Sequence, residues 1–233
     1  LTPGKKTGMV ALNVKTGETI WECKELHDGA GYSSILPTKV GDVPVYVQQT
    51  MQSAVGVRAT DGKLLFKTGE IGRKIAVVPT PVVADGYAFF TAGYGAGCEC
   101  YKLAPDGNGG VKAEKVYTNN RSMANHHGGV IQVGDYVYGH SDQGGWTCLP
   151  FKQTKPEPAW QNPKFGKGSI AYADGHFFCY AERGGELAVI KATPDAWTEV
   201  GRMKLPKTSP TSKGSGLVWA HPVIADGKLF LRD

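Results

Sequence analysis

Long apolar runs are missing from this 233-residue chain, and none approaches the roughly 20 residues that a membrane-spanning helix needs. Charged residues make up only 20%, and the Lys and Arg residues are scattered, with no dense basic run beside stacked aromatics. No two cysteines are adjacent or spaced C-x-x-C, so C-x-x-C-H is absent as well. These absences argue against a membrane-spanning helix, a nucleic-acid interface, a covalently attached haem and a paired zinc knuckle.

Glycine and proline are abundant instead, with 32 and 14 residues. Such a composition implies many tight turns and short elements, which is typical of an all-β fold. No segment shows sustained helical periodicity. Aromatic and β-branched residues are spread along the whole length, so disorder is not expected.

One unit recurs along the chain, consisting of a small polar entry, an apolar strand, an Asp/Gly turn and an aromatic strand. The turn aspartates recur at intervals of 39 to 52 residues and are Asp42, Asp85, Asp135, Asp174 and Asp226. An Asp-Gly pair between two apolar runs is a strong hairpin signal, because glycine takes a positive φ without steric cost. The interval fits a four-stranded propeller blade.

A second hairpin follows this unit in the clearest copies, over residues 10–21 and 55–66. Each copy ends in a large aromatic residue, Trp21 or Phe66, which we expect to pack between neighbouring sheets. Later copies keep less of the pattern: Trp160 keeps the aromatic residue, and segment 104–112 reads as a loop around an Asp-Gly turn.

Four full units fit the sequence, over residues 30–69, 76–119, 123–164 and 165–206, with half-units at 8–26 and 218–233. The predicted fold class is therefore all-β, a β-propeller of four-stranded blades within one domain, residues 1–233. Unpaired strand edges are avoided in natural proteins, so either the half-units join into a fifth blade or further chain completes them. We expect the second case, a fragment of a longer propeller of about eight blades.

Three stretches carry a family resemblance. Residues 11–21, A-L-N-V-K-T-G-E-T-I-W, resemble the Ala-x-Asp-x-x-Thr-Gly-x-x-x-Trp repeat of quinoprotein (PQQ-like) propellers, with Asn13 in place of the usual Asp. Residues 81–86 and 222–227 resemble the P-V-V-x-D-G strand of the same family. The resemblance covers nearly the whole chain and is specific for the fold, but its motifs say little about function.

The branches of this family imply different functions. One contains alcohol dehydrogenases that bind pyrroloquinoline quinone (PQQ) and calcium. A second resembles the propeller lipoprotein of the outer-membrane β-barrel assembly machinery, which binds partners without chemistry. A third comprises single-domain bacterial PQQ-like proteins of largely unknown role, generally about twice this length. Phrases at residues 31–34, 93–98, 125–129 and 219–222 look most like this third branch.

The dehydrogenase branch carries a disulfide between adjacent cysteines, which this chain lacks, and its calcium ligands and Asp base have no evident counterparts here. We therefore expect a non-enzymatic binding or scaffold propeller that is periplasmic or otherwise extracytoplasmic. Its partner would be a protein or a small ligand at the channel mouth. The alternative is a PQQ-dependent quinoprotein oxidoreductase of the alcohol dehydrogenase type, with PQQ and calcium at the same mouth.

The entry residues of successive propeller blades gather at one mouth of the channel, because the first strand of each blade lines it. Those of this chain are Tyr32, Ser33, Ser34, Thr80, His126, His127, Lys167, Ser169 and His221. Such side chains suit a small-molecule site or a metal site, with His127 and His221 as candidate ligands. The alternative is structural, since Ser, Thr and His also hydrogen-bond neighbouring blades. No catalytic residue is predicted.

Two further expectations concern particular side chains. On a strand, the adjacent His126 and His127 would face opposite sides, so at most one should point into the channel. The five cysteines leave at least one unpaired within the chain. A disulfide from Cys98 or Cys100 to Cys148 or Cys179 requires an oxidising compartment, and buried thiols are the alternative.

Overall fold

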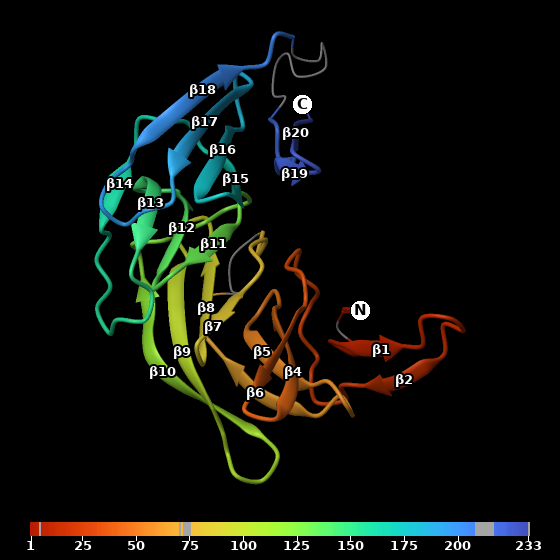
Figure 1. The fold of residues 1–233 in the computed structure, drawn as a ribbon. Helices are drawn as coiled ribbons and strands as arrows, with labels where there is room; N and C mark the ends of the chain where they lie inside the picture. Colours follow the sequence, from red (N-terminus) through yellow and green to blue (C-terminus); the bar gives the residue numbers. More distant parts are fainter. Residues whose placement is uncertain (5, 70, 72–75, 208–216, 233) are drawn as a thin grey trace. The chain divides into compact units, whose positions relative to one another are not determined.

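The computed structural model describes residues 1–4, 6–69, 71, 76–207 and 217–232. Strands are the regular elements of these residues, and they form four four-stranded and two two-stranded antiparallel sheets (Figure 1). No helix in this described part of the chain is long and apolar enough to span a membrane. The chain divides into two compact units, Leu1–Arg121 and Ser122–Asp233.

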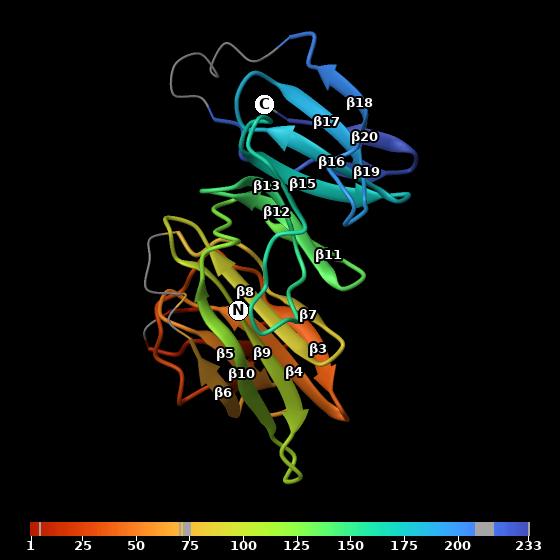
Figure 2. The same cartoon turned by 90° about the vertical axis from the view of Figure 1, so that its left-hand side faces the viewer.

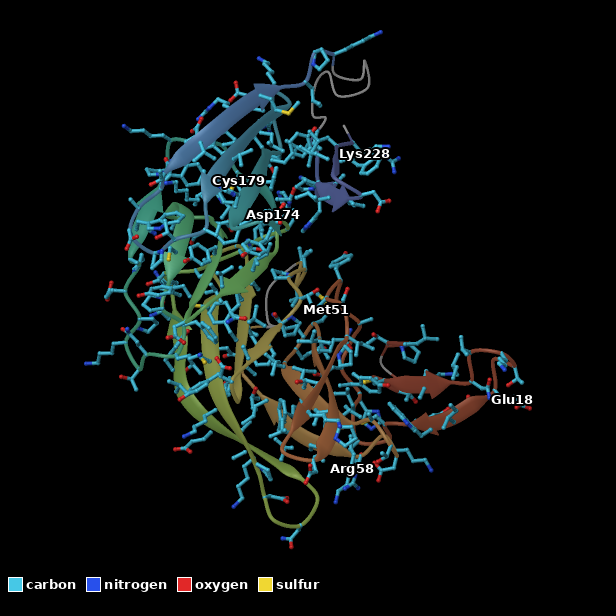
Figure 3. The ribbon with its side chains drawn as sticks, in the orientation of Figure 1. Glu18, Met51, Arg58, Asp174, Cys179 and Lys228 are labelled. Atoms are coloured by element: carbon cyan, nitrogen blue, oxygen red, sulfur yellow. The ribbon has the colours of Figure 1, made fainter. Side chains whose placement is uncertain are left out.

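The first unit holds one two-stranded and two four-stranded sheets, each running up and down in chain order. The two-stranded sheet contains β1 (Val10–Leu12) and β2 (Thr19–Glu22), with Glu18 at the tip of the hairpin (Figure 3). The next sheet contains β3 (Leu36–Val40), β4 (Val43–Gln49), β5 (Ala54–Arg58) and β6 (Leu64–Thr68). The third contains β7 (Val82–Ala84), β8 (Tyr87–Ala92), β9 (Gly97–Pro105) and β10 (Val111–Asn120).

The second unit repeats this plan with the two-stranded sheet last. Its first sheet contains β11 (Val130–Val133), β12 (Tyr136–Ser141), β13 (Gly145–Leu149) and β14 (Trp160–Asn162). The next contains β15 (Gly168–Ala173), β16 (His176–Ala181), β17 (Glu186–Lys191) and β18 (Glu199–Lys204). The last contains β19 (Val223–Ala225) and β20 (Lys228–Phe230). The four predicted blades and two half-blades are thus confirmed, whereas the single domain over 1–233 stays a prediction.

The order of Asp and Gly selects the turn that joins the first two strands of each sheet. In the Asp-Gly turns, the aspartates have φ near 50°; they are Asp85, Asp174 and Asp226. The glycine that follows each of them also has a positive φ. This is the pattern of a type I′ turn, and Figure 3 labels Asp174 at one of them. At 41–42 and 134–135 the order is reversed, and Gly alone has positive φ, as in a type II′ turn.

The prediction of a loop over 104–112 is wrong except at its centre. Strands β9 and β10 have nine and ten residues, and their pairing extends to Pro105 opposite Val111 (Figure 2). The turn is tight because the Asp106 carboxylate accepts hydrogen bonds from the backbone N–H groups of Asn108 and Gly110, at 2.7 and 2.8 Å. Because these hydrogen bonds fix the turn, strands β9 and β10 remain paired up to its first residue.

An aromatic residue on an outer strand links neighbouring sheets in both units, as expected. The Trp21 indole on β2 donates a hydrogen bond to the carbonyl of Ala59, in the β5–β6 turn of the next sheet, at 3.0 Å. The Trp160 indole on β14 donates in the same way to Thr193, between β17 and β18, also at 3.0 Å. We call each contact a tryptophan lock. It joins one blade to the next through an apolar ring and one directional bond.

The cores of the sheets are apolar and include buried cysteines. Cys23, Cys148 and Cys179 are buried thiols, and Figure 3 labels Cys179 within its sheet. Burial is the main cause that raises the pKa of the Cys148 thiol to about 11, against a smaller opposite effect of its hydrogen bond with Tyr138. Cys148 and Cys179 therefore follow the buried-thiol alternative.

Candidate functional site

The predicted mouth residues divide between the two units. Tyr32, Ser33, Ser34 and Thr80 belong to the first unit. Ser33 is buried, its hydroxyl donates to the carbonyl of Ser34 at 3.2 Å, and its own carbonyl accepts from the Gln48 amide at 2.9 Å. Tyr32, Ser34 and Thr80 are exposed, and no hydrogen bond joins their side chains within the described residues. None of these four side chains is hydrogen-bonded to a neighbouring blade in the described residues, so both interpretations of this group stay predictions.

A buried carboxylate that the sequence did not single out lies beside the β4–β5 turn of the first unit. Asp28 accepts hydrogen bonds from the hydroxyls of Thr50 and Ser53 and pairs with Lys67. Burial alone would raise the pKa of Asp28, but the hydrogen bonds from Lys67, Ser53 and Thr50 outweigh it and hold the pKa below its usual range. Asp28 thus ties the turn to the outer strand.

In the second unit, Lys167 connects two of the sheets. It precedes β15, and its Nζ lies 2.8 Å from Nδ1 of His126 and 2.7 Å from Oδ1 of Asp142. The ammonium group donates to both, which leaves the proton of neutral His126 on Nε2. Burial and then the nearby Lys167 charge lower the pKa of His126, so the imidazole is neutral at pH 7.

His127 has a different partner. Its Nε2 lies 2.8 Å from Oε2 of Glu182, which follows β16. Burial lowers the pKa of His127 although the Glu182 hydrogen bond raises it, so the neutral ring donates Nε2–H to the carboxylate. The side chain is only 7% exposed, and its Nδ1 has no hydrogen-bond partner within the described residues. His127 therefore keeps one unused acceptor.

The segment before β19 is held against the same residues by three hydrogen bonds. The Val218 amide donates to the Glu182 carbonyl at 2.9 Å. The Ser169 hydroxyl donates to the Ala220 carbonyl at 3.1 Å, and His221 Nε2 donates to the His127 carbonyl at 3.1 Å. These bonds fix the backbone on both sides of Trp219.

Trp219 covers the pair of imidazoles. Its ring centroid lies 5.5 Å from that of His127 and 6.5 Å from that of His126, yet 55% of the residue is exposed. We call the whole group the histidine–lysine cluster; it consists of His126, His127, Asp142, Lys167, Glu182, Trp219 and His221. All seven come from the entry edge, which we define as the edge where the first strand of each sheet begins and the second ends.

A further imidazole lies behind the cluster. His140, on β12, packs its ring edge-to-face against Trp146 at 5.7 Å. Burial, and then the charge of Lys167, lower the pKa of His140 to about 4. The charge of Lys167 thus contributes to lowering the pKa of all three imidazoles, which disfavours further positive charge there.

The structure brings together the predicted residues of the second unit, but not as expected. The rings of His126 and His127 are in contact, 5.2 Å apart, so the expectation that they face opposite sides is wrong. The two residues precede β11, which begins at Val130, so the alternation of a strand does not apply to them. Ser169 is buried in the inter-blade hydrogen bond described above, which is a structural role.

Sequence reasoning missed Asp142, Glu182 and Trp219 as members of the site. Asp142 directly follows β12 and Glu182 directly follows β16. The signal available in the sequence was the position directly after the second, aromatic strand of each sheet. In an antiparallel pair the second strand ends where the first begins, so this position also lies at the entry edge.

Neither a metal nor a calcium-bound quinone fits these side chains well. No group of three or more His, Cys, Asp or Glu in the described part of the chain is arranged to hold a metal ion. Nε2 of the candidate ligands His127 and His221 is engaged in hydrogen bonds. Calcium prefers six to eight oxygen ligands, whereas Asp142 and Glu182 here are paired with basic side chains.

A family model described as "Outer membrane protein assembly factor BamB" matches residues 2–155, more than half of the chain. The chain belongs to this BamB family. The expected resemblance to PQQ-like propellers is thereby confirmed, and the sheets described above are blades of a β-propeller fold. No curated protein matches the chain.

Three solved structures are similar to this BamB family member. BamB from Moraxella catarrhalis has 12% identity and a TM-score of 0.41, with 94% of this chain and 71% of that chain covered. The computationally designed Ika8 protein has 9% identity and a TM-score of 0.49, with 97% and 74% covered. A chain of a nidogen/laminin complex has 10% identity and a TM-score of 0.42, with 84% and 71% covered. The family assignment rests on the sequence match, not on these likenesses.

Proposed function

We propose that this chain is a non-enzymatic, extracytoplasmic binding or scaffold module, and that its recognition site includes the histidine–lysine cluster. The observation that carries the proposal is the exposed Trp219 ring, held by three hydrogen bonds over the imidazoles of His126 and His127. Large aromatic residues that are both exposed and fixed are typical of the centres of binding sites.

The charges of the cluster support binding more than catalysis. Lys167 is neutralised by Asp142, and His127 is oriented by Glu182. A general base must have a free acceptor atom within reach of the substrate, and a nucleophile must have a base beside it. Here Lys167 is held by His126 and Asp142, and the unused acceptor of His127, Nδ1, is buried away from solvent. The family description, an outer-membrane assembly factor, supports an extracytoplasmic location and a protein partner.

The test is site-specific photo-crosslinking in cells that make the protein. A photoreactive phenylalanine analogue at position 219 should give a discrete adduct, whereas the same group at Tyr172 should not. Tyr172 is the matched control, because it is 44% exposed in the same unit but lies outside the cluster. The proposal fails if position 219 gives no more adduct than position 172, or if the protein fractionates with the cytoplasm.

The enzyme alternative is tested separately with the purified protein. Reconstitution with PQQ and calcium should give no dye-linked alcohol oxidation above that of a heat-denatured sample. Turnover that depends on added quinone would replace the binding proposal by the oxidoreductase.

A further inference from the structure

We propose that protonation of His127 opens the segment that carries Trp219, so that the indole is held in place at neutral pH and released in acid. The Trp219 segment is defined as residues 217–222, which precede β19 and belong to no strand. This opening is a property of the chain by itself and goes beyond the proposed function. The loss of a recognition surface in acid, which would follow from it, rests on the proposed function.

The imidazole of His127 has no hydrogen-bond partner at the atom where a second proton would bind. Its Nε2–H already donates to Oε2 of Glu182 at 2.8 Å, so the added proton must bind Nδ1. Nδ1 is buried and has no hydrogen-bond partner within the described residues. A buried N–H group without an acceptor is unfavourable, and a positive charge on the ring adds to that cost. The imidazolium form therefore favours an arrangement in which water reaches Nδ1.

The Trp219 ring covers this imidazole at the protein surface. The two ring centroids are 5.5 Å apart, and the ring planes are inclined by 34°. The His127 side chain is only 7% exposed, whereas Trp219 is 55% exposed. An indole face attracts an imidazolium ring, but at this inclination the Nδ1–H bond points along the indole face and not into it. Moving Trp219 aside thus gives the protonated ring access to water.

Titratable and charged side chains face His127 from each element packed against it. They are His126 beside it, His140 on β12, Asp142 after β12, Lys167 before β15, Glu182 after β16 and His221 before β19. With the imidazoles neutral, they comprise one ammonium group and two carboxylates.

The balance of these influences opposes protonation as long as the Trp219 segment is closed. Burial is the main cause that lowers the pKa of His127; Glu182 raises this pKa, and Lys167 and His221 lower it further. The closed arrangement therefore binds the proton more weakly than a solvated ring does. Protonation must then shift the equilibrium towards the open arrangement, because the open arrangement binds the proton more tightly.

Few interactions hold the Trp219 segment in place. Its hydrogen bonds to the neighbouring sheets are those of the Val218 amide, the Ser169 hydroxyl and His221 Nε2. The last of these is accepted by the carbonyl of His127, so the position of the segment depends on that of the titrating residue. A segment that few hydrogen bonds tie to a sheet can open locally while the sheet stays folded.

The experiment is hydrogen exchange of the purified protein, followed by NMR. The Val218 amide reports the opening directly, because it donates to the Glu182 carbonyl. After correction for the intrinsic exchange rate, its protection should fall at least about fivefold between about pH 7.5 and about pH 5. The midpoint of this fall should coincide with the protonation of His127 Nδ1, followed by its nitrogen chemical shift. Dilute urea should speed the exchange of amides in β16 and β17 but not that of Val218, because a local opening exposes little surface.

Two variants assign the effect to one histidine. His127→Gln keeps a donor for Glu182 but cannot take up a proton, so the change of Val218 protection with pH should disappear. His176→Gln is the matched control, because His176 lies in the same unit on β16 and bonds the Asp174 carbonyl outside the cluster. It should keep the fivefold fall. Circular dichroism confirms that each variant is folded, and if His127→Gln is not, the two midpoints in the unchanged protein decide.

Three results would overturn the proposal: Val218 protection that does not change with pH, a fall that persists in His127→Gln, or a urea dependence equal to that of the strand amides. Midpoints that differ would overturn it as well. Failure of the crosslink at position 219 would instead remove the binding role of Trp219 and leave the opening unaffected, so the two failures are distinguishable.

Discussion

Five of the six histidines of the chain lie in Ser122–Asp233, whereas His27 alone lies in Leu1–Arg121. The two units nevertheless build their sheets from the same strands and turns. At the entry edge of the first unit, amides and hydroxyls such as Gln48 and Ser33 hydrogen-bond the backbone, and Asp28 holds a turn. In the second unit the same edge carries imidazoles, an ammonium group and an exposed indole.

This difference teaches that the blade framework does not depend on the side chains at its entry edge. Strand pairing and the Asp/Gly turns are supplied elsewhere in each repeat, and the two tryptophan locks likewise lie away from this edge. The entry edge can therefore be structural in one unit and carry a candidate site in the other, as expected when function resides in sites placed on a fold. The following predictions test how far the two units differ.

The largest effect should come from the tryptophan locks. Trp160 contacts both Tyr138 and Trp197, at 6.0 and 5.8 Å, whereas Trp21 has Tyr46 at 6.2 Å. We expect Trp160→Ala to lower the free energy of unfolding of the second unit by about 4 kcal/mol, and Trp21→Ala to cost the first unit about half as much. Trp160→Phe should cost about 1 kcal/mol, since it removes mainly the hydrogen bond. Hydrogen exchange followed in each unit separately measures these losses, and equal costs for the two alanine variants would contradict the comparison.

The next effect separates a buried carboxylate from a more exposed one. Asp28→Ala should lower the free energy of unfolding by about 3 kcal/mol, because Thr50 and Ser53 lose a buried acceptor. Asp142→Ala removes an ion pair whose side chains are 26% and 21% exposed, and should cost about 1 kcal/mol or less. Urea titration of both variants at pH 7 is the measurement. A larger loss from Asp142→Ala would show that the cluster stabilises the fold.

The third effect is a response to acid that the second unit should show through its imidazoles. The pKa values of His126, His127 and His140 lie below the ordinary 6.5, reaching about 4 for His140, so the unfolded chain binds protons first. The contribution of these histidines to the free energy of unfolding should therefore be largest above pH 6.5. It should fall as the pH drops towards 4 and level off below that pH. In His140→Phe, the decrease in the free energy of unfolding between pH 6.5 and 4 should be smaller by about 2 kcal/mol, allowing for partial exposure of the imidazole. Denaturation at several pH values tests this. His176→Phe is the matched control, and an unchanged slope in His140→Phe would refute the assignment.

The sequence predicted most of the fold because the repeat carries its own turn chemistry. Asp85 and Asp174 mark I′ turns that can join only adjacent antiparallel strands, so the blade boundaries followed from them. The hairpin β9–β10 was missed because Asp106 shortens its turn through side-chain hydrogen bonds that composition does not reveal.

The candidate site was predicted only in part, for a geometric reason. The sequence pattern identified four of its members, each shortly before a first strand: His126, His127, Lys167 and His221. Asp142 and Glu182 are 25 and 55 residues from their partners Lys167 and His127, and only the register of neighbouring strands brings them together. The contact between the two histidine rings also depended on where β11 begins, at Val130.

The tryptophan locks have a consequence for how the chain is made. The carbonyl that accepts the hydrogen bond of each indole comes later in the sequence, 38 residues after Trp21 and 33 residues after Trp160. At translation rates of 5 to 20 residues per second, a sheet that has left the ribosome lacks this hydrogen bond to the next sheet for roughly 2 to 8 s. Its outer strand is exposed to proteases and chaperones during that interval. For these two sheets, the order of synthesis is thus also the order in which their outer strands become fixed.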